Sequence, residues 1–266
     1  MDIQNDYIEI NRLLWNKRTE THIQSEFYDL EGFKSGKSSL NDIELNLLGD
    51  IRGKKILHLQ CHFGQDTLTL ARMGAKVTGV DLSDRSIEFA NQLAHAIGEN
   101  ATFICCDIFD LKLHLQEKFD IIFTSYGTIG WLPDLNKWAD IISHFLQPMG
   151  KFIFVEFHPI IWMFDNNLSE VSYHYNNVEP IIENESGTYA NANADINLKS
   201  VGWNHSLSEV ISSLLKHNLN ILDFKEYYYS PYNCLSNMIE KEPKKFVNKN
   251  LKDKIPYVYS LVCKKL

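Results

Sequence analysis

The chain has 266 residues, of which 44% are hydrophobic and 23% charged, and its formal net charge is −8 at pH 7. These values are typical of a globular protein with one sizeable core. The acidic balance argues against a nucleic-acid-binding protein, which needs a basic face, so we predict no nucleic-acid partner. The sequence lacks a run of the roughly 20 apolar residues that span a bilayer, and we predict no membrane partner.

The cysteines and the first residues bear on location. The cysteines lack any C-x-x-C pairing, which predicts reduced thiols and neither a zinc site nor another metal site. They are Cys61, Cys105, Cys106, Cys234 and Cys263. The N-terminal residues are acidic and lack the charged and apolar regions of a signal peptide. We therefore expect a cytoplasmic protein.

Apolar periodicity along the chain predicts helices that alternate with short strands. The helices are expected at 7–24, 39–48, 65–73, 83–98 and 132–145 and after a capping box at Ser206–Glu209. The strands are expected at 55–61, 76–81, 101–107, 119–125, 150–156, 220–229 and 256–264. The strands are nearly continuously apolar, as strands covered on both faces are. This alternation indicates an α/β fold with a doubly wound, mostly parallel sheet.

Three segments do not fit this alternation. Residues 27–33 are rich in aromatic side chains and are predicted to form a loop. Residues 159–204 are rich in Asn, Ser, Tyr and Glu and are too long for an ordinary connection, so we expect a lid or an interface element. Six lysines lie between residues 241 and 254, and we interpret them as a solvated surface segment.

Residues 55–83 have the order of a nucleotide-binding βαβ unit. An apolar run enters a loop that ends at Gly64, and a second apolar run ends at Asp81. A dinucleotide would require G-x-G-x-x-G, because glycines let the backbone close on a pyrophosphate. Only one glycine is present here, so the loop suits a smaller ligand that has a ribose, such as S-adenosylmethionine (SAM). Asp81 would accept hydrogen bonds from the ribose hydroxyls.

The position of this loop makes it the first candidate for contact with the cofactor. Ligands of doubly wound sheets bind beyond the carboxyl ends of the strands, where the strand order reverses. Gly64 allows a sharp turn into the next helix, whose N-terminus attracts a carboxylate. The predicted contacts of the loop come from Gln60, Cys61, His62 and Gly64.

The motif L-H-L-Q-C-H-F-G at residues 57–64 resembles the first motif of class I SAM-dependent methyltransferases. More narrowly, it resembles that of bacterial small-molecule methyltransferases in which this motif replaces E-x-G-x-G-x-G. The resemblance covers roughly residues 10–160 and continues more loosely to the final strand. It implies a Rossmann-like sheet of seven strands, the last of them antiparallel and inserted between strands five and six. It also implies SAM as cofactor and S-adenosylhomocysteine (SAH) as product.

The resemblance also assigns residues to the adenosine part of the cofactor. Asp107 ends the third predicted strand, where the family places a carboxylate that accepts from the adenine amino group. Asp110 is its rival three residues later. Ile108 would supply a neighbouring backbone amide, and Leu82 would pack on the adenine face. Together with Asp81, these residues would hold the adenosine.

Other predicted contacts lie nearer the methyl group. Ser125 and Tyr126 follow the fourth predicted strand, where the family positions the donor against the acceptor. Trp15 and Arg18 belong to an N-terminal segment that folds over the cofactor in this family, where aromatic rings would shield the sulfonium from water. We therefore expect residues 1–50 to form an N-terminal helical cap. Residues 51–266 would form a SAM-binding methyltransferase domain with a lid insertion at about 159–204.

The candidate general base is His158, which follows the fifth predicted strand together with Glu156 and would face the same crevice. Histidine is the side chain that most often accepts a proton near neutral pH. The alternative is a structural role, because His158 stands in a loop before a proline. The segments that would choose the acceptor match no signature that we can tie to a substrate.

The sequence thus predicts an enzyme that transfers a methyl group from SAM to an oxygen, nitrogen or other nucleophile of a small molecule by in-line displacement. One alternative is a SAM-binding regulatory or interaction protein without catalysis. A second is a nicotinamide-dependent oxidoreductase, against which the missing glycines count. Oligomeric state is left open.

Overall fold

The computed structural model describes residues 6–177 and 179–266, and its centre is a seven-stranded sheet in the order β3-β2-β1-β4-β5-β11-β8. The strands are β1 Lys55–Leu59, β2 Lys76–Asp81, β3 Ala101–Cys105, β4 Phe119–Ser125, β5 Leu146–Phe157, β8 Leu219–Tyr227 and β11 Val258–Lys265. The first five strands are parallel, and β11 runs antiparallel to both β5 and β8. The predicted fold class and the inserted last strand are confirmed.

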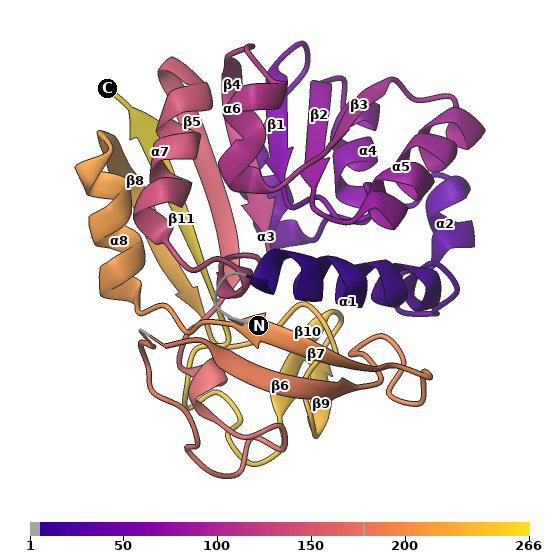
Figure 1. Cartoon of the computed structure of the whole chain (residues 1–266), viewed down its shortest axis with the longest axis vertical. Helices are drawn as coiled ribbons and strands as arrows, with labels where there is room; N and C mark the ends of the chain where they lie inside the picture. Colours follow the sequence, from indigo (N-terminus) through magenta and orange to yellow (C-terminus); the bar gives the residue numbers. More distant parts are fainter. Residues whose placement is uncertain (1–5, 178) are drawn as a thin grey trace.

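Helices cover both faces of this sheet (Figure 1). The helices on the sheet are α3 Asp42–Leu48, α4 Gln65–Arg72, α5 Asp84–Ile97, α6 Leu111–His114, α7 Leu135–Phe145 and α8 Leu207–Lys216. Alternate side chains of β1 divide the core, since Leu57 packs with α7 and α8 and Ile56 packs with α3 and α4. The strands are therefore apolar on both faces, as the sequence pattern requires.

Local signals set the helix boundaries. Ser83 caps α5 through its hydroxyl, which accepts from the backbone N–H of Ser86 at 3.0 Å, and Gly98 ends this helix with φ +71°. Ser206 caps α8 in the same way. The predicted capping box there is only half formed, because the Glu209 side chain pairs with the His205 ring at 3.0 Å instead of reaching back to Ser206.

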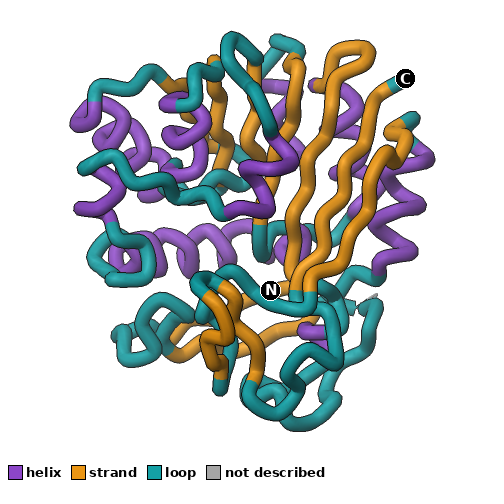
Figure 2. The backbone as a smooth tube through the Cα atoms, turned by 180° about the vertical axis from the view of Figure 1, so that it is seen from behind, coloured by secondary structure: helices purple, strands orange, loops and turns teal. Residues whose placement is uncertain are grey.

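The remaining elements lie across the carboxyl ends of the strands. Helix α1, Tyr7–His22, runs along this edge, and two hairpins lie beyond it (Figures 1 and 2). The hairpins are β6 Ile181–Ser186 with β7 Asn197–Gly202, and β9 Met238–Glu242 with β10 Lys245–Asn248. Together they form a layer that covers the edge of the sheet where a doubly wound fold binds its ligand.

Several boundaries in this layer differ from the sequence prediction. The aromatic loop at 27–33 contains part of a short helix, α2 Leu30–Lys34, whose N-cap Asp29 accepts from Gly32. The long segment 159–204 contains the β6–β7 hairpin, and the lysine-rich segment contains most of the β9–β10 hairpin. Residues 1–5 of the predicted cap and position 178 of the predicted lid lie outside the described residues. Within the described part of the chain, we find no helix long and apolar enough to span a membrane.

Candidate functional site

A cavity of about 1060 Å³ lies between the carboxyl edge of the sheet, α1 and the two hairpins. All twelve residues that the sequence analysis assigned to a cofactor line its walls. They are Trp15, Arg18, Gln60, Cys61, His62, Gly64, Asp81, Leu82, Asp107, Ile108, Ser125 and Tyr126. The structure thus brings these residues together, and their contact with a cofactor stays a prediction.

The loop after β1 is held in an unusual backbone conformation. Gln60, His62 and Gly64 have φ values of +55°, +51° and +83°. At Gly64 a glycine is required, since a Cβ atom would lie 2.8 Å from the Phe103 ring. Gln60 and His62 adopt the left-handed region although they carry side chains, which costs about 1 kcal/mol or more each. Such strain is concentrated at functional sites and persists because the surroundings enforce it.

Asp81 fixes this loop to the next helix. One of its carboxylate oxygens accepts from the backbone N–H of His62 at 2.8 Å, and the other accepts from the N–H of Ser83 at 2.9 Å. Burial raises the pKa of Asp81 to about 6, although these hydrogen bonds oppose the shift. Each oxygen keeps a second lone pair, so the carboxylate can also accept from a ligand hydroxyl.

Asp107 is distinguished from its rival by position. One of its carboxylate oxygens accepts from the backbone N–H of Phe109 at 3.0 Å, which caps a short 3-10 helix at residues 108–110. Asp107 lines the cavity, and burial raises the pKa of its carboxyl group. Asp110 is exposed and lies outside the set of residues that line the cavity. Of the two carboxylates, Asp107 is therefore the one placed to meet a ligand.

The loop after β4 is organised by Glu156, whose structural role the sequence analysis missed. The Glu156 carboxylate is 2% exposed and accepts from the backbone N–H groups of Gly127, Thr128, Ile129 and Phe157 and from the Thr128 hydroxyl. Burial raises the pKa of Glu156. The available signal was an isolated acid at the end of an apolar strand. Most of its partners are distant in the sequence, so the sequence alone could not identify them.

His158 does not occupy the predicted position. Its ring hydrogen-bonds the Glu226 carboxylate of β8 at 3.0 Å, and its other nitrogen accepts from the backbone N–H of Ile160 at 3.2 Å. His158 is 5% exposed and is not among the residues that line the cavity. We therefore correct its assignment from general base to a structural residue that joins the end of β5 to β8.

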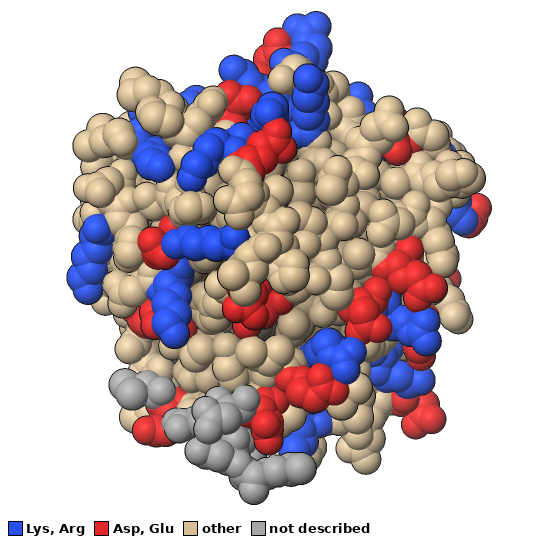
Figure 3. Space-filling view, turned by 45° about the horizontal axis from the view of Figure 1, so that its top comes forward, with Lys and Arg blue, Asp and Glu red and all other residues tan. Residues whose placement is uncertain are grey.

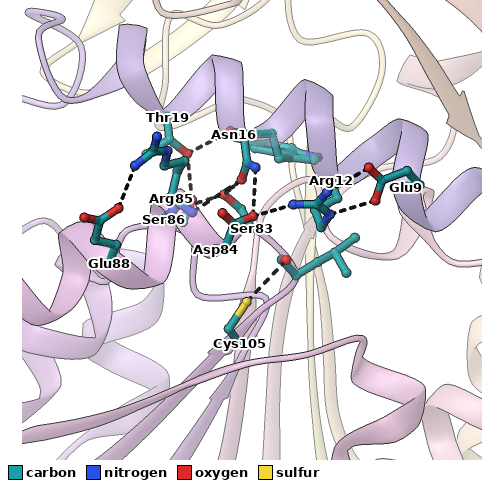
Figure 4. A network of polar contacts seen from close by, with 12 residues as sticks. Glu9, Arg12, Asn16, Thr19, Ser83, Asp84, Arg85, Ser86, Glu88 and Cys105 are labelled. Carbon is teal, nitrogen blue, oxygen red and sulfur yellow. Dashed lines mark hydrogen bonds and ion pairs between the residues drawn. The ribbon is translucent and has the colours of Figure 1, made fainter.

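Helix α1 is fastened to the start of α5 by polar side chains (Figure 4). Arg12 bonds the Asp84 carboxylate at 2.7 Å. Asn16 accepts from the Ser83 hydroxyl at 2.7 Å, and Thr19 pairs with the Ser86 hydroxyl at 2.6 Å. These contacts fix which face of α1 is turned toward the cavity.

Three residues of α1 line the cavity, Asn11, Trp15 and Arg18. The Arg18 guanidinium lies over the rings of Trp15 and Trp131, at 5.0 and 5.4 Å from their centroids. It also pairs with the Glu185 carboxylate of β6 at 3.1 Å. Arg18 thus joins α1 to the β6–β7 hairpin while one side of its guanidinium faces the aromatic wall of the cavity.

The buried His22 and the half-buried His62 join α1, the loop after β1 and the segment between β6 and β7, and the sequence analysis did not find this pair. His22 and His62 share a hydrogen bond of 2.9 Å. The second ring nitrogen of His22 bonds the Thr188 hydroxyl at 2.7 Å, and that of His62 lies 3.1 Å from the Ser86 hydroxyl. Burial lowers the pKa of His22 to about 3 and also lowers that of His62, so both rings are neutral at pH 7.

Polar residues that the sequence analysis did not assign lie at the other end of the cavity. Asp66 is in the first turn of α4, and its carboxylate accepts from the Ser125 hydroxyl at 3.4 Å. The rings of Tyr126 and Tyr232 meet edge to face at 5.0 Å. The signal for Asp66 was its place two residues after Gly64, and Tyr232 lay in a segment without a recognisable pattern.

Comparison with known protein families gives a match to a family described as "Methyltransferase domain", over residues 51–222. Among curated proteins, the chain is similar to a protein named ubiquinone biosynthesis O-methyltransferase from Idiomarina loihiensis. The two are 27% identical over 136 residues, which cover 50% of this chain and 56% of that protein. The chain thus spans about half the length of this curated relative.

Solved structures show the same fold. A SAM-dependent methyltransferase from Clostridium acetobutylicum superposes with a TM-score of 0.58 at 18% identity, covering 94% of this chain and 98% of that chain. A SAM-dependent methyltransferase from Methanosarcina mazei gives a TM-score of 0.58 at 15% identity, covering 85% of this chain and 98% of that chain. At such identities the likeness concerns the fold.

Proposed function

Since this chain belongs to the methyltransferase-domain family, which confirms the resemblance, we propose that it transfers the methyl group of SAM to a nucleophilic atom of a small molecule. The observation that carries the proposal is the cavity, which gathers all twelve predicted cofactor residues at the carboxyl edge of the sheet. When bound, SAM supplies a methyl group made electrophilic by a sulfonium. The residues of the chain bind this cofactor, orient it and keep water away.

The adenosine part would lie between Asp81 and Asp107. Asp81 would accept from the ribose hydroxyls through the lone pairs that His62 and Ser83 leave free. Asp107 would accept from the adenine amino group, with the backbone of Ile108 beside it and Leu82 against the ring face. Two carboxylates that are already oriented by backbone N–H groups lose little entropy when the ligand arrives.

Two buried atoms without a hydrogen-bond partner among the described residues fit the charged methionine end. The Gln60 side chain donates its amide to the Thr128 carbonyl at 2.8 Å, which leaves its oxygen unpartnered. The Arg18 Nε–H is also unpartnered. An amide oxygen suits an ammonium group, and a guanidinium suits a carboxylate, so the donors and acceptors present match this cofactor.

Catalysis in this proposal comes from positioning and exclusion of water. Trp15 and Trp131 meet edge to face at 5.4 Å over the cavity, and their rings favour a neighbouring cation. The cover formed by α1 and the lid hairpin removes water from around the acceptor, and holding two reactants together supplies much of the rate enhancement. His158 takes no part, because it lies outside the cavity.

The small-molecule acceptor and the domain organisation are part of the proposal. The curated relative's name includes O-methyltransferase, which supports a small acceptor and leaves oxygen, nitrogen and other nucleophiles open. Basic and acidic side chains intermingle on the face shown in Figure 3, which suits a small-molecule enzyme better than a nucleic-acid-binding protein. The five cysteines are free thiols, which supports the cytoplasm as the location. Residues 1–50 would act as the cap and 159–204 as the lid.

Isothermal titration calorimetry with SAH and with NAD tests the proposal. SAH should bind and raise the melting temperature, because a ligand selective for the native state stabilises it, and NAD should do neither. Binding of NAD without binding of SAH would reverse the proposal in favour of an oxidoreductase. Release of SAH from SAM in the presence of a library of small metabolites would distinguish an enzyme from a SAM-binding regulator.

A further inference from the structure

Two acids at or behind one part of the cavity wall are not used by the proposed cofactor contacts. Glu44 of α3 is 1% exposed and lies behind the wall, where one of its oxygens accepts from the backbone N–H of the lining residue Asn41 at 3.0 Å. Asp66 lines the cavity and accepts from the Ser125 hydroxyl. The rings of Tyr28, Tyr126 and Tyr232 line the cavity beside them. We call these five residues the acidic end; they are Tyr28, Glu44, Asp66, Tyr126 and Tyr232.

These acids have no cationic partner. Neither Glu44 nor Asp66 forms an ion pair with any described residue. Lys244 lines the same part of the cavity, but its ammonium bonds the side-chain oxygen of Asn41 at 3.3 Å. Burial raises the pKa of Glu44 to about 7 and also raises that of Asp66, since a charge without a partner is costly in such surroundings.

Several hydrogen-bonding atoms at this end are unpartnered among the described residues. They are the second carboxylate oxygen of Glu44, the side-chain nitrogen of Asn41 and the Tyr126 hydroxyl. Asn41 is 5% exposed and lines the cavity, so its free nitrogen is buried at the wall. Buried polar groups in native proteins are nearly always paired, and leaving one unpaired costs about 1–3 kcal/mol. Tyr126 and Asn41 also interact with the Glu44 carboxylate and lower its pKa, so these groups form one polar cluster. A ligand at this end would complete the hydrogen bonding of that cluster.

The chemistry of these groups identifies the ligand. Carboxylates accept hydrogen bonds and attract positive charge, and tyrosine rings attract cations to their faces. Tyr232 also stacks on the Phe27 ring, with centroids 5.6 Å apart, which keeps this wall aromatic. A carboxylate or phosphate ligand would be repelled by Glu44 and Asp66. An ammonium group supplies both the charge and the N–H donors that the acidic end lacks.

We propose that the acidic end is a binding subsite for the ammonium group of an amine that accepts the methyl group. This inference rests on the proposed methyl transfer, because it assigns a further part of the same cavity. The methionine ammonium of SAM is already assigned to the Gln60 oxygen, which leaves the acidic end for the acceptor.

The test compares the wild-type protein with Asp66→Asn and Glu44→Gln, which keep shape and remove charge. The matched control is Asp29→Asn, an acid at the same cavity that already pairs with Lys37. Calorimetry measures the affinity for SAH, which carries the ammonium, and for 5′-methylthioadenosine, which lacks the amino-acid part. A second titration adds tyramine or phenethylamine to the SAH complex, each beside its uncharged alcohol, tyrosol or 2-phenylethanol.

In both variants SAH affinity should stay within about twofold of the wild type, because Gln60 binds the methionine ammonium in this proposal. The amines should bind wild-type protein at least about tenfold more tightly than their alcohols, and the variants should lose this preference. A loss of SAH affinity of about tenfold or more in Asp66→Asn, with 5′-methylthioadenosine within about twofold, would assign the acidic end to the cofactor and overturn the proposal. Binding of 5′-methylthioadenosine shows that each variant is folded.

The proposal is also overturned if the amines show no preference over the alcohols in the wild-type protein, or if both variants keep the wild-type preference. It is also overturned if Asp29→Asn produces the same losses as Asp66→Asn, since the effect would then be one of general charge. Failure of the wild-type protein to bind SAH at all would refute the proposed function instead.

Discussion

Two pairs of carboxylates in the site are used in opposite ways. Asp81 and Glu156 direct their oxygens at backbone N–H groups, and these bonds hold the loops after β1 and β4 in place. Glu44 and Asp66 have few donors and no cation among the described residues. The first pair shapes the site before any ligand binds, whereas the second pair has hydrogen-bonding capacity left for a ligand.

This difference indicates which substitutions each pair of carboxylates tolerates. A carboxylate that anchors the backbone cannot be changed without disturbing the fold, because each lost bond leaves a buried N–H unsatisfied. A carboxylate that has no partner in the free protein can be changed with little effect on stability, and its removal can even stabilise the free protein. Substitutions in the two pairs of carboxylates should therefore separate effects on the free energy of unfolding from effects on ligand affinity.

The largest effect is expected from Glu156→Ala. This change leaves four backbone N–H groups, those of Gly127, Thr128, Ile129 and Phe157, without their acceptor. We expect the free energy of unfolding to fall by about 3–5 kcal/mol, measured by chemical denaturation, and SAH binding to be lost.

Glu88→Ala is the control for this change, because it removes an exposed acid that pairs only at the surface with Arg85. It should alter the free energy of unfolding by less than about 0.5 kcal/mol. Equal losses in the two variants would contradict the anchoring role of Glu156.

A smaller effect is expected from Asp81→Ala, which should affect both binding and stability. Loss of hydrogen bonds to a charged acceptor costs about 1.5–3 kcal/mol each, so calorimetry should show SAH affinity reduced by about one to three orders of magnitude. Stability should also fall, because the N–H groups of His62 and Ser83 lose their acceptor. Glu88→Gln, a change to an exposed acid of α5 that pairs with Arg85 at the surface, should leave SAH affinity nearly unchanged. Unaltered affinity in folded Asp81→Ala protein would refute the ribose contact.

The histidine pair predicts a pH effect of intermediate size. The pKa of His22 is about 3 in the folded protein, below its ordinary value of 6.5, because of burial and then the charge of Arg18. Between these values the unfolded chain binds more protons, so stability is lost as the pH falls below 6.5. For one such group the loss between pH 6.5 and pH 5 is about 2 kcal/mol.

His22→Gln should remove this part of the pH dependence, measured by denaturation at pH 7.5 and pH 5.0. His58 continues to titrate in this variant, so its contribution cancels in the comparison. Because His62 shares a hydrogen bond with His22, the difference between the two proteins reports on the histidine pair. His114→Gln, the same replacement at an exposed position, should retain the wild-type dependence. Parallel pH curves for wild type and His22→Gln would contradict the prediction.

The smallest effect is expected from a substitution at the contact between α1 and the β6–β7 hairpin. The Asn11 side chain donates to the backbone carbonyl of Val201 at 2.8 Å and accepts from its N–H at 3.0 Å, which joins α1 to β7. Asn11→Ala should speed hydrogen exchange in β7 by about thirtyfold, because two bonds of about 1 kcal/mol each are lost. Asn16→Ala, which loosens α1 from α5 instead, should leave β7 protected. Equal exchange in β7 of wild type and Asn11→Ala would show that the hairpin is held by other contacts.

The sequence predicted the sheet well and the cover poorly, for a physical reason. Strands β1 and β2 are short apolar runs whose ends are marked by Gly64 and Asp81, so local pattern and fold agree there. The β6–β7 and β9–β10 hairpins are half exposed and polar, and they are fixed by contacts with distant segments instead of by their own pattern.

The site shows the same division. The predicted cofactor residues stand at the ends of strands or on the first helix, where chain order gives their place. The expectation that His158 faces the cavity failed because its partner, Glu226, lies on a strand whose neighbours are set by the insertion of β11. The importance of Glu44 and Tyr232 also depends on three-dimensional proximity. Single-sequence reasoning finds residues at element ends and misses those that tertiary contacts bring together.

The place of β11 also has a consequence for how the protein is made. Strand β5 obtains one of its two neighbours from β11, which is synthesised after β8. During translation, one backbone edge of β5 therefore stays without its partner until the ribosome has released residues 258–265. Unpaired edges of apolar strands promote aggregation. A nascent chain stalled before this point would thus expose the unpaired edge of a long apolar strand.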